Sequence, residues 1–203
     1  MKSWRTALLL STLLLPLSAA TAVSAPDAKT TIQTLDDALL DTMKNADKLG
    51  YQGRYDKLAP VLTQSFNMPL MARIAVGPHR ASLTPDQQSK VIDAFTRLSI
   101  ATYAARFDGY DGEQFQILSD TPITGGDEVV NTKMIRPHDE AVDLNYRLRP
   151  DNGAWKVIDV FLSGTISQLA NYRSEFAATL RSQGPDALVA TIEQKVKDLA
   201  PKG

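Results

Sequence analysis

Residues of the kinds that perform catalysis or bind metals are few in this chain and widely spaced. There is no cysteine, and the two histidines, His79 and His138, lie beside turn-forming residues, far from each other in sequence. Adjacent carboxylates such as Asp36 and Asp37 diverge on any regular element, so we expect them to be solvated surface charges. The spacings typical of a nucleophile elbow, a zinc-protease helix or a phosphate-binding loop are absent. We therefore expect no enzymatic activity and no bound metal or cofactor.

Two charged residues fall on otherwise apolar patterns. Arg173 has helical spacing with Leu169 and Phe176, and Asp159 alternates with the apolar residues of a predicted strand over 154–162. Because a buried arginine needs a partner, we expect Arg173 to pair with Asp159 and to hold a helix against a sheet. The alternative is that Arg173 lies at the mouth of a pocket and binds an anionic head group.

The elements that position these residues are indicated by the hydrophobic period. In the first half of the chain, apolar residues repeat every three or four positions, which predicts helices over residues 32–50, 54–62, 68–76 and 84–107. The last of these has the clearest start, because Thr84, Pro85 and Gln87 form the pattern of a capping box. The helical period returns near the end of the chain, where Gly184 and Pro185 separate two further helices.

The period changes to two after the fourth helix. It predicts strands over residues 114–119, 128–136, 141–149 and 154–162. Their short connections, rich in turn formers, imply antiparallel hairpins. The predicted fold class is α+β: a twisted antiparallel four-stranded sheet of NTF2-like shape, covered on one face by N- and C-terminal helices that enclose an apolar pocket.

The composition is that of a globular protein, with 203 residues, of which 43% are hydrophobic and 22% charged. A formal charge of −1 and the lack of a basic cluster argue against a nucleic-acid partner. Residues 1–25 combine a basic start, a leucine-rich run and small residues, which is the pattern of a secretory signal peptide cleaved after Ala22 or a few residues later. We expect residues 26–203 to form a single exported domain.

Several segments have, in order along the chain, the residue pattern of one known family. They are residues 66–68, 75–77, 83–87, 142–146, 155–160, 164–167 and 173–176. In these segments the chain resembles the MlaC-like family of periplasmic lipid-shuttle proteins, known from toluene-tolerance and lipid-asymmetry pathways. Residues 164–170 and 173–176 look most like the subgroup associated with hopanoid biosynthesis, HpnM.

The resemblance implies a soluble periplasmic carrier of phospholipid or hopanoid, which works as an auxiliary component of an ABC transporter. Such a carrier makes transient contact with inner- and outer-membrane complexes, and we expect it to be a monomer. Each methylene that it buries contributes about 0.8 kcal/mol, so apolar surface suffices for binding. We expect the lipid-binding pocket to be lined by three residues from the capped helix and six from the last two strands: Phe95, Leu98, Tyr103, Val142, Leu144, Tyr146, Trp155, Val157 and Phe161.

Two other classes of function stay open at this point. One is an NTF2-like enzyme that uses Asp159 and Tyr146 as an acid–base pair in a conical pocket. The other is a non-catalytic adaptor for envelope proteins, which predicts a filled core and an exposed apolar patch. A lipid-sized apolar cavity favours the carrier over the adaptor.

Overall fold

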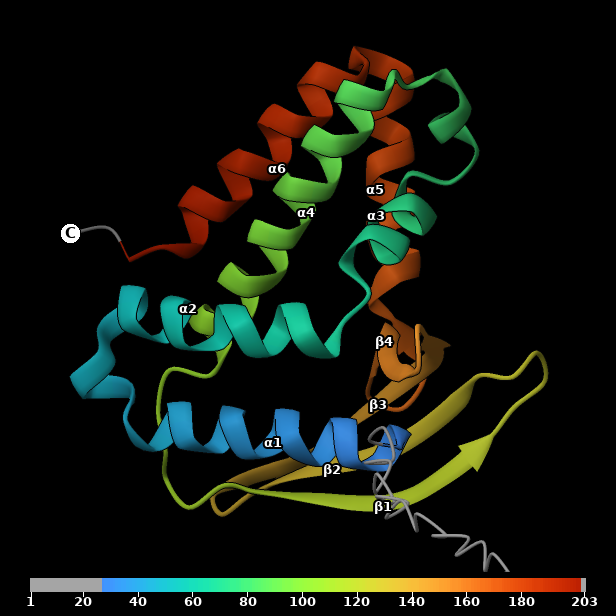
Figure 1. The fold of residues 1–203 in the computed structure, drawn as a ribbon. Coiled ribbons are helices and arrows are strands. Elements are labelled where there is room, and N and C mark those ends of the chain that lie inside the picture. The colour runs from blue at the N-terminus through green and yellow to red at the C-terminus, as the bar shows by residue number, and fades with distance from the viewer. Residues whose placement is uncertain (1–26, 202–203) are drawn as a thin grey trace, which may run out of the picture.

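The computed structural model describes residues 27–201, and Figure 1 shows their fold. The predicted signal peptide, residues 1–25, lies outside the described residues. Within the described part, four helices come first, with a short 3-10 helix before the fourth; a five-stranded sheet and two more helices follow. Helices before and after one antiparallel sheet make the fold α+β, which confirms the predicted class.

Side-chain caps explain where two of the first helices begin. α1 (Ala28–Lys44) starts after Asp27, whose carboxylate accepts a hydrogen bond from the Thr30 N–H at 2.6 Å. α3 (Met68–Val76) starts after Asn67, whose side chain caps it in the same way. Each of these helices therefore begins directly after a polar capping residue that can be identified in the sequence.

α2 (Ala46–Ser65) lies between these two helices and differs from its prediction. Gly50 has a φ of 59°, which interrupts the helical geometry near the start of α2. The sequence predicted a first helix that ended at Gly50 and a second helix over residues 54–62 only. In the structure α1 ends at Lys44 instead.

α4 (Pro85–Arg106) begins with the predicted capping box. The Thr84 hydroxyl accepts a hydrogen bond from the Gln87 N–H at 3.2 Å, and the Gln87 side chain accepts one from the Thr84 N–H at 3.1 Å. The 3-10 helix η1 (Gly77–Ser82) connects α3 to this start. α4 packs against α2, α3 and α6, and Figure 1 shows it as a long helix beside α6.

The sheet is an antiparallel meander in which strands pair in chain order. Its strands are β1 (Gln114–Pro122), β2 (Glu128–Arg136), β3 (Asp139–Asp151), β4 (Ala154–Leu162) and β5 (Ile166–Ser167). The predicted bounds of β2 and β4 are confirmed, while β1 and β3 are longer than predicted. The sequence predicted four strands because β5, which pairs with the end of β4, has only two residues and shows no period.

A β-bulge in β4 changes which side chains face the helices. Leu148 of β3 pairs with Val157, and Arg147 pairs with Asp159, so Ile158 has no partner in β3. Because side chains alternate along a strand, one extra residue moves every following side chain to the opposite face. The inward-facing residues of β4 therefore have odd numbers before the bulge, as in Val157, and even numbers after it, as in Val160 and Leu162.

Two helices follow the sheet, of which α5 (Gln168–Gln183) packs against β4 and α6 (Pro185–Leu199) packs against α4 and α5. They are separated by Gly184, whose φ of 84° allows the sharp turn. In Figure 1 the sheet lies along the bottom of the molecule, α1 runs beside it, and α4, α5 and α6 rise away from it. No helix within residues 27–201 combines the length and the apolar character that a membrane crossing requires.

Candidate functional site

A cavity of about 310 Å³ lies where α4 and α5 meet the inner face of the sheet. Six aromatic side chains contribute to its wall: Phe66, Phe95, Tyr103, Phe107, Tyr146 and Tyr172. Aliphatic and methionine side chains from α3 and the strands complete it: Met71, Met134, Val142, Leu144, Val160 and Leu162. Ligand pockets in proteins occupy roughly 300 to 1,000 Å³ and are mostly apolar, so this cavity is at the lower end of that range. Such a wall suits the hydrocarbon part of a ligand.

The aromatic side chains of the wall hold one another in position. Tyr103 stacks on Phe107 with ring centroids 5.5 Å apart, and Phe66 meets Tyr103 edge-on at 5.8 Å. Phe95 meets Tyr172 edge-on at 5.4 Å, which joins α4 to α5. Stacked and edge-to-face rings are the favoured geometries of aromatic pairs, so α4, α5 and the end of α2 form one connected wall.

Five of the residues predicted to line a pocket do line this cavity: Phe95, Tyr103, Val142, Leu144 and Tyr146. They come from α4 and from the part of β3 that faces the helices. Both elements are regular at these positions, so a period read from the sequence places the side chains on the correct face.

The other four predicted residues do not line the cavity: Leu98, Trp155, Val157 and Phe161. For Phe161 the cause is the bulge, because Val160 and Leu162 face the cavity after the extra residue Ile158. Val157, before the bulge, is fully buried in the core. Leu98 is also buried in the core.

The predicted pair of Asp159 and Arg173 does not form. The Asp159 carboxylate accepts hydrogen bonds from the Ser167 hydroxyl at 2.6 Å and from the Leu169 N–H at 3.1 Å, so it caps the start of α5. Arg173 is exposed and lies against Gly77, where an added β-carbon would come within 3.1 Å of the Arg173 Nε. No ion pair among residues 27–201 involves Arg173.

The predicted position of Arg173 was wrong because Tyr172, one position earlier, takes the place on the inner face of α5 that the spacing assigned to Arg173. Within α5 the inner face is formed by Leu169, Tyr172 and Phe176, with Tyr172 in the cavity wall. Arg173 therefore lies at the edge of this face, and the missing side chain of the neighbouring glycine leaves room for it to reach solvent.

The position of Asp159 also bears on the enzymatic alternative. Tyr146 pairs in register with Val160, whose side chain faces the cavity. Asp159 is one residue earlier, on the opposite face of β4, and its oxygens are engaged at the start of α5. The acid–base pair of Asp159 and Tyr146 that the enzyme requires is therefore not assembled.

Polar side chains that were not predicted from the sequence occupy part of the cavity wall. They are Ser99, Thr102, Arg106, Ser163 and Gln168. Arg106 and Ser163 are exposed, so they mark the mouth of the cavity, and no ion pair among residues 27–201 involves Arg106. Arg106 could have been predicted from the sequence to lie near the pocket, because its spacing from Phe95 puts both residues on the same face of α4.

A buried carboxyl group, that of Asp36, lies near two tyrosines of the cavity wall, Tyr103 and Tyr146. Asp36 is not the solvated surface charge that the sequence analysis expected: it is 2% exposed, because the inner face of α1 includes this position. Burial, and to a smaller extent the charge of Asp37, raises the pKa of Asp36 to about 7. Burial likewise raises the pKa values of Tyr103 and Tyr146, and the nearby charge of Asp36 contributes to both increases.

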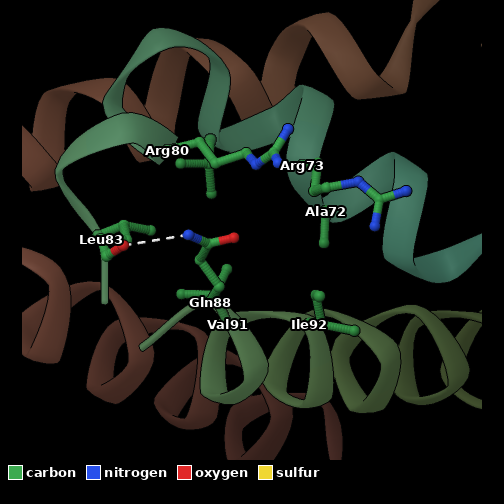
Figure 2. Close-up of a pocket in the computed structure, with 8 residues that line it drawn as sticks. Ala72, Arg73, Arg80, Leu83, Gln88, Val91 and Ile92 are labelled. Carbon is green, nitrogen blue, oxygen red and sulfur yellow. Dashed lines mark hydrogen bonds between the residues drawn. The ribbon is translucent and has the colours of Figure 1, made fainter. Parts of the chain in front are cut away.

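A second, much smaller pocket lies between α3, η1 and α4. Figure 2 shows its lining, in which the Gln88 side chain donates a hydrogen bond to the Leu83 carbonyl at 3.0 Å. Its volume is about 10 Å³, which is at most the room that a single water molecule needs. It is therefore a packing gap beside Arg73 and Arg80, and the larger cavity is the candidate functional site.

The described residues offer no comparable site for a metal. Within 27–201, no three histidine, aspartate or glutamate side chains are arranged to hold an ion. His138 lies instead within 3.4 Å of Asp111 as an exposed pair at the surface. The side chains around the cavity are thus suited to binding a largely apolar ligand with a polar group at the mouth.

The chain is similar in sequence to one protein family and in structure to a protein that binds a phospholipid. The family model described as "MlaC protein" matches residues 33–194. A phospholipid-binding protein from Ralstonia solanacearum, solved in complex with a phospholipid, is similar in structure with a TM-score of 0.77 and 25% sequence identity. The similarity covers 87% of this chain and 100% of that chain. A comparison with curated proteins found no match.

Proposed function

The chain belongs to the MlaC protein family, and from this premise we propose that it is a lipid carrier that holds a phospholipid in the cavity between α4, α5 and the sheet. The observation that carries the proposal is the cavity itself: about 310 Å³, with an aromatic and aliphatic wall and a polar mouth. The similar protein from Ralstonia solanacearum binds a phospholipid, and the whole of it is covered by the similarity. A carrier of this kind needs no catalytic group.

In the proposed complex, acyl chains lie against the aromatic and aliphatic wall and the head group stays at the mouth. Arg106 is the cationic side chain there, with the Ser163 hydroxyl and the Gln168 amide beside the same opening. An exposed guanidinium suits a phosphate, because it presents several N–H donors to its oxygens. This arrangement gives Arg106 the head-group role that the sequence analysis considered for Arg173.

The cargo is larger than the cavity in this conformation. A volume of about 310 Å³ is at the lower end for a drug-sized ligand, and a lipid with two acyl chains is larger than such a ligand. Loading therefore requires α5 or the strand wall to move outward, or one chain to lie along the mouth. The same movement, induced by a partner, provides a route for release, because a ligand in a closed apolar site leaves slowly.

The family and the predicted signal peptide of residues 1–25 support a proposal for the physiological setting. In this proposal the mature domain is a periplasmic monomer that moves lipid between inner- and outer-membrane complexes, as an auxiliary component of an ABC transporter. A hopanoid is the alternative cargo, and it is supported by the resemblance of residues 164–170 and 173–176 to the hopanoid-associated subgroup.

The direct experiment is lipid extraction from the purified mature protein, followed by mass spectrometry. The expected result is about one phospholipid or hopanoid per protein, together with uptake of labelled lipid from vesicles of phosphatidylethanolamine and phosphatidylglycerol. Protein that carries no lipid from its native envelope and takes none from these vesicles would contradict the proposal. The extracted species also decides between the two cargoes.

A further inference from the structure

The buried side of the cavity contains polar groups that the carrier function, as proposed so far, does not use. Tyr146 lines the cavity and is fully buried, and its hydroxyl makes no hydrogen bond of good geometry among residues 27–201, although the Tyr103 side chain lies close to it. Both carboxyl oxygens of Asp36 are buried without a partner in the same part of the chain. Buried polar atoms in native proteins are nearly always hydrogen-bonded, so these three call for a physical explanation.

The unpartnered atoms belong to one place in the fold. Tyr103 lines the cavity from α4 and Tyr146 lines it from β3. Asp36 lies on the buried face of α1, close enough to both tyrosines for its charge to act on them. The two phenol groups thus belong to the cavity wall, and the carboxyl group of Asp36, which does not itself line the cavity, is buried near them.

These groups have complementary hydrogen-bonding capacity. A carboxylate accepts, a protonated carboxyl also donates, and each phenol does both. An alcohol on a ligand donates one hydrogen bond and accepts others, so it can serve as partner to a phenol and to a carboxyl at once. An unbranched hydrocarbon chain at the same position leaves all of these atoms unsatisfied.

We propose that the side chains of Tyr103 and Tyr146 in the cavity wall, together with the carboxyl group of Asp36 buried near them, form a polar subsite, which binds a hydroxyl group on the hydrophobic part of the lipid cargo. This inference rests on the proposed function, since it needs a lipid in the cavity. It narrows the class of cargo to lipids whose apolar portion carries an alcohol. It also gives Tyr146, on β3, a role in specificity that an apolar residue of the same shape does not have.

The test compares matched ligands that differ by one hydroxyl, on protein from which lipid has been removed. Oleic and ricinoleic acid place the hydroxyl in the middle of the chain, and hexadecanoic and ω-hydroxyhexadecanoic acid place it at the end. In a cavity without the subsite, the hydroxyl weakens binding by roughly tenfold or more, because it loses its water partners. With the subsite, the hydroxylated acid of at least one pair binds at least as tightly as its plain partner.

Substitution of the subsite makes the comparison specific. Both acids of a pair contact the same aromatic ring at position 146 in a given variant. The change in the ratio of their Kd values between wild type and Tyr146→Phe therefore measures the effect of the Tyr146 hydroxyl alone. We expect this ratio to shift by about tenfold against the hydroxylated acid in Tyr146→Phe, and also in Asp36→Leu. Tyr55→Phe and Asp37→Leu are the matched controls, because Tyr55 does not line the cavity and Asp37 is exposed; their ratios stay at the wild-type value.

The variants are expected to fold, because each removes a polar group that has no partner, and thermal melting checks this. A hydroxyl penalty that is equal in wild type, Tyr146→Phe and Asp36→Leu for both pairs overturns the subsite. An equal penalty overturns the subsite even if the acids without a hydroxyl bind well, in which case the lipid-carrier function stands. Failure of both plain acids and of vesicle phospholipid to bind overturns the carrier function itself.

Discussion

At the scale of single residues, Asp36 has the most unusual environment in the described part of the molecule. It is an acidic residue on the core face of α1, with no hydrogen-bond partner there and with a pKa raised to about 7 from an ordinary value of 3.8. Burial disfavours the charged carboxylate, so the native state keeps a proton that the unfolded chain loses at lower pH. The sign of this shift determines how stability depends on pH.

We expect the contribution of Asp36 to stability to fall as the pH rises. Between about pH 4 and about pH 7 the native state binds more protons than the unfolded state, so each step upward in pH favours unfolding, by a total on the order of 4 kcal/mol. Asp36→Asn removes this dependence and makes the protein more stable than wild type at about pH 8. Urea unfolding across this range measures the difference in slope.

The control for this prediction is Asp37→Asn, at the exposed neighbouring position on α1. It retains the buried carboxyl and should keep most of the slope of the wild type, with a slightly smaller total change because the charge of Asp37 contributes to the raised pKa of Asp36. If the free energy of unfolding of Asp36→Asn has the same pH dependence as that of wild type, Asp36 is not protonated in the native state near neutral pH, and the prediction is wrong.

Arg106 is the second residue whose environment makes a prediction. It is exposed at the cavity mouth without an ion pair among residues 27–201, so we expect Arg106→Ala to weaken retention of phosphatidylglycerol by roughly two- to fivefold. The loss should shrink as salt is raised, because exposed charges are screened. Arg97→Ala is the matched control on the same helix, where Arg97 pairs with Glu193 at 2.9 Å away from the cavity. Equal retention by Arg106→Ala and Arg97→Ala would show that Arg106 does not hold the head group.

At the scale of elements, the bulge in β4 decides which side chains form the strand wall of the cavity. Ile158 is the extra residue, and after it Val160 and Leu162 face the cavity while Asp159 and Phe161 face away. The same change of face brings the Asp159 carboxylate to the start of α5, where it caps the helix that carries Gln168 and Tyr172. One inserted residue therefore sets both the wall and the position of the helix opposite it.

Two neighbouring substitutions in β4 test this arrangement. Leu162→Trp places a larger side chain in the cavity, so we expect lipid uptake from vesicles to fall about tenfold or more. Phe161→Trp makes a similar change on the other face of the same strand and should leave uptake within about twofold of wild type. Melting temperatures of both variants show that they fold. Loss of uptake in Phe161→Trp but not in Leu162→Trp would reverse the assignment of faces.

At the scale of the whole molecule, the helices and the sheet enclose space instead of filling it. The adaptor alternative predicted a packed interior, whereas about 310 Å³ remains open between α4, α5 and the sheet. An empty apolar cavity lacks the contacts that a filled core provides, so it weakens the native state. A ligand that fills it supplies those contacts.

We therefore expect bound lipid to stabilise the protein. A ligand at about a hundred times its Kd adds roughly 2.7 kcal/mol to the free energy of unfolding, which corresponds to a rise in Tm of roughly 5 to 10 °C for a domain of this size. Thermal melting of delipidated protein before and after incubation with phospholipid vesicles measures this rise. Leu162→Trp, with its cavity occupied by the indole, should show little change; a Tm of wild type that is insensitive to lipid would argue against a ligand in the cavity.

The sequence by itself determined those features that depend on local periodicity and capping. The α+β class, the bounds of α3, β2 and β4, and the capping box at Thr84 follow from apolar spacing and side-chain chemistry within a few residues. The same regular periods placed Phe95 and Tyr103 on α4, and Val142, Leu144 and Tyr146 on β3, in the wall of the cavity.

Only the tertiary structure decided the rest of the site. A bulge is defined by the register between two strands. The sequence of β4 alone therefore does not indicate that Leu162, and not Phe161, faces the cavity. The burial of Asp36 depends on which face of α1 meets the sheet and on the tyrosines that approach it from α4 and β3. The open volume between α4, α5 and the sheet depends on how closely the packed elements approach. Periodicity gives the direction of a side chain, but not the distance to what lies opposite it.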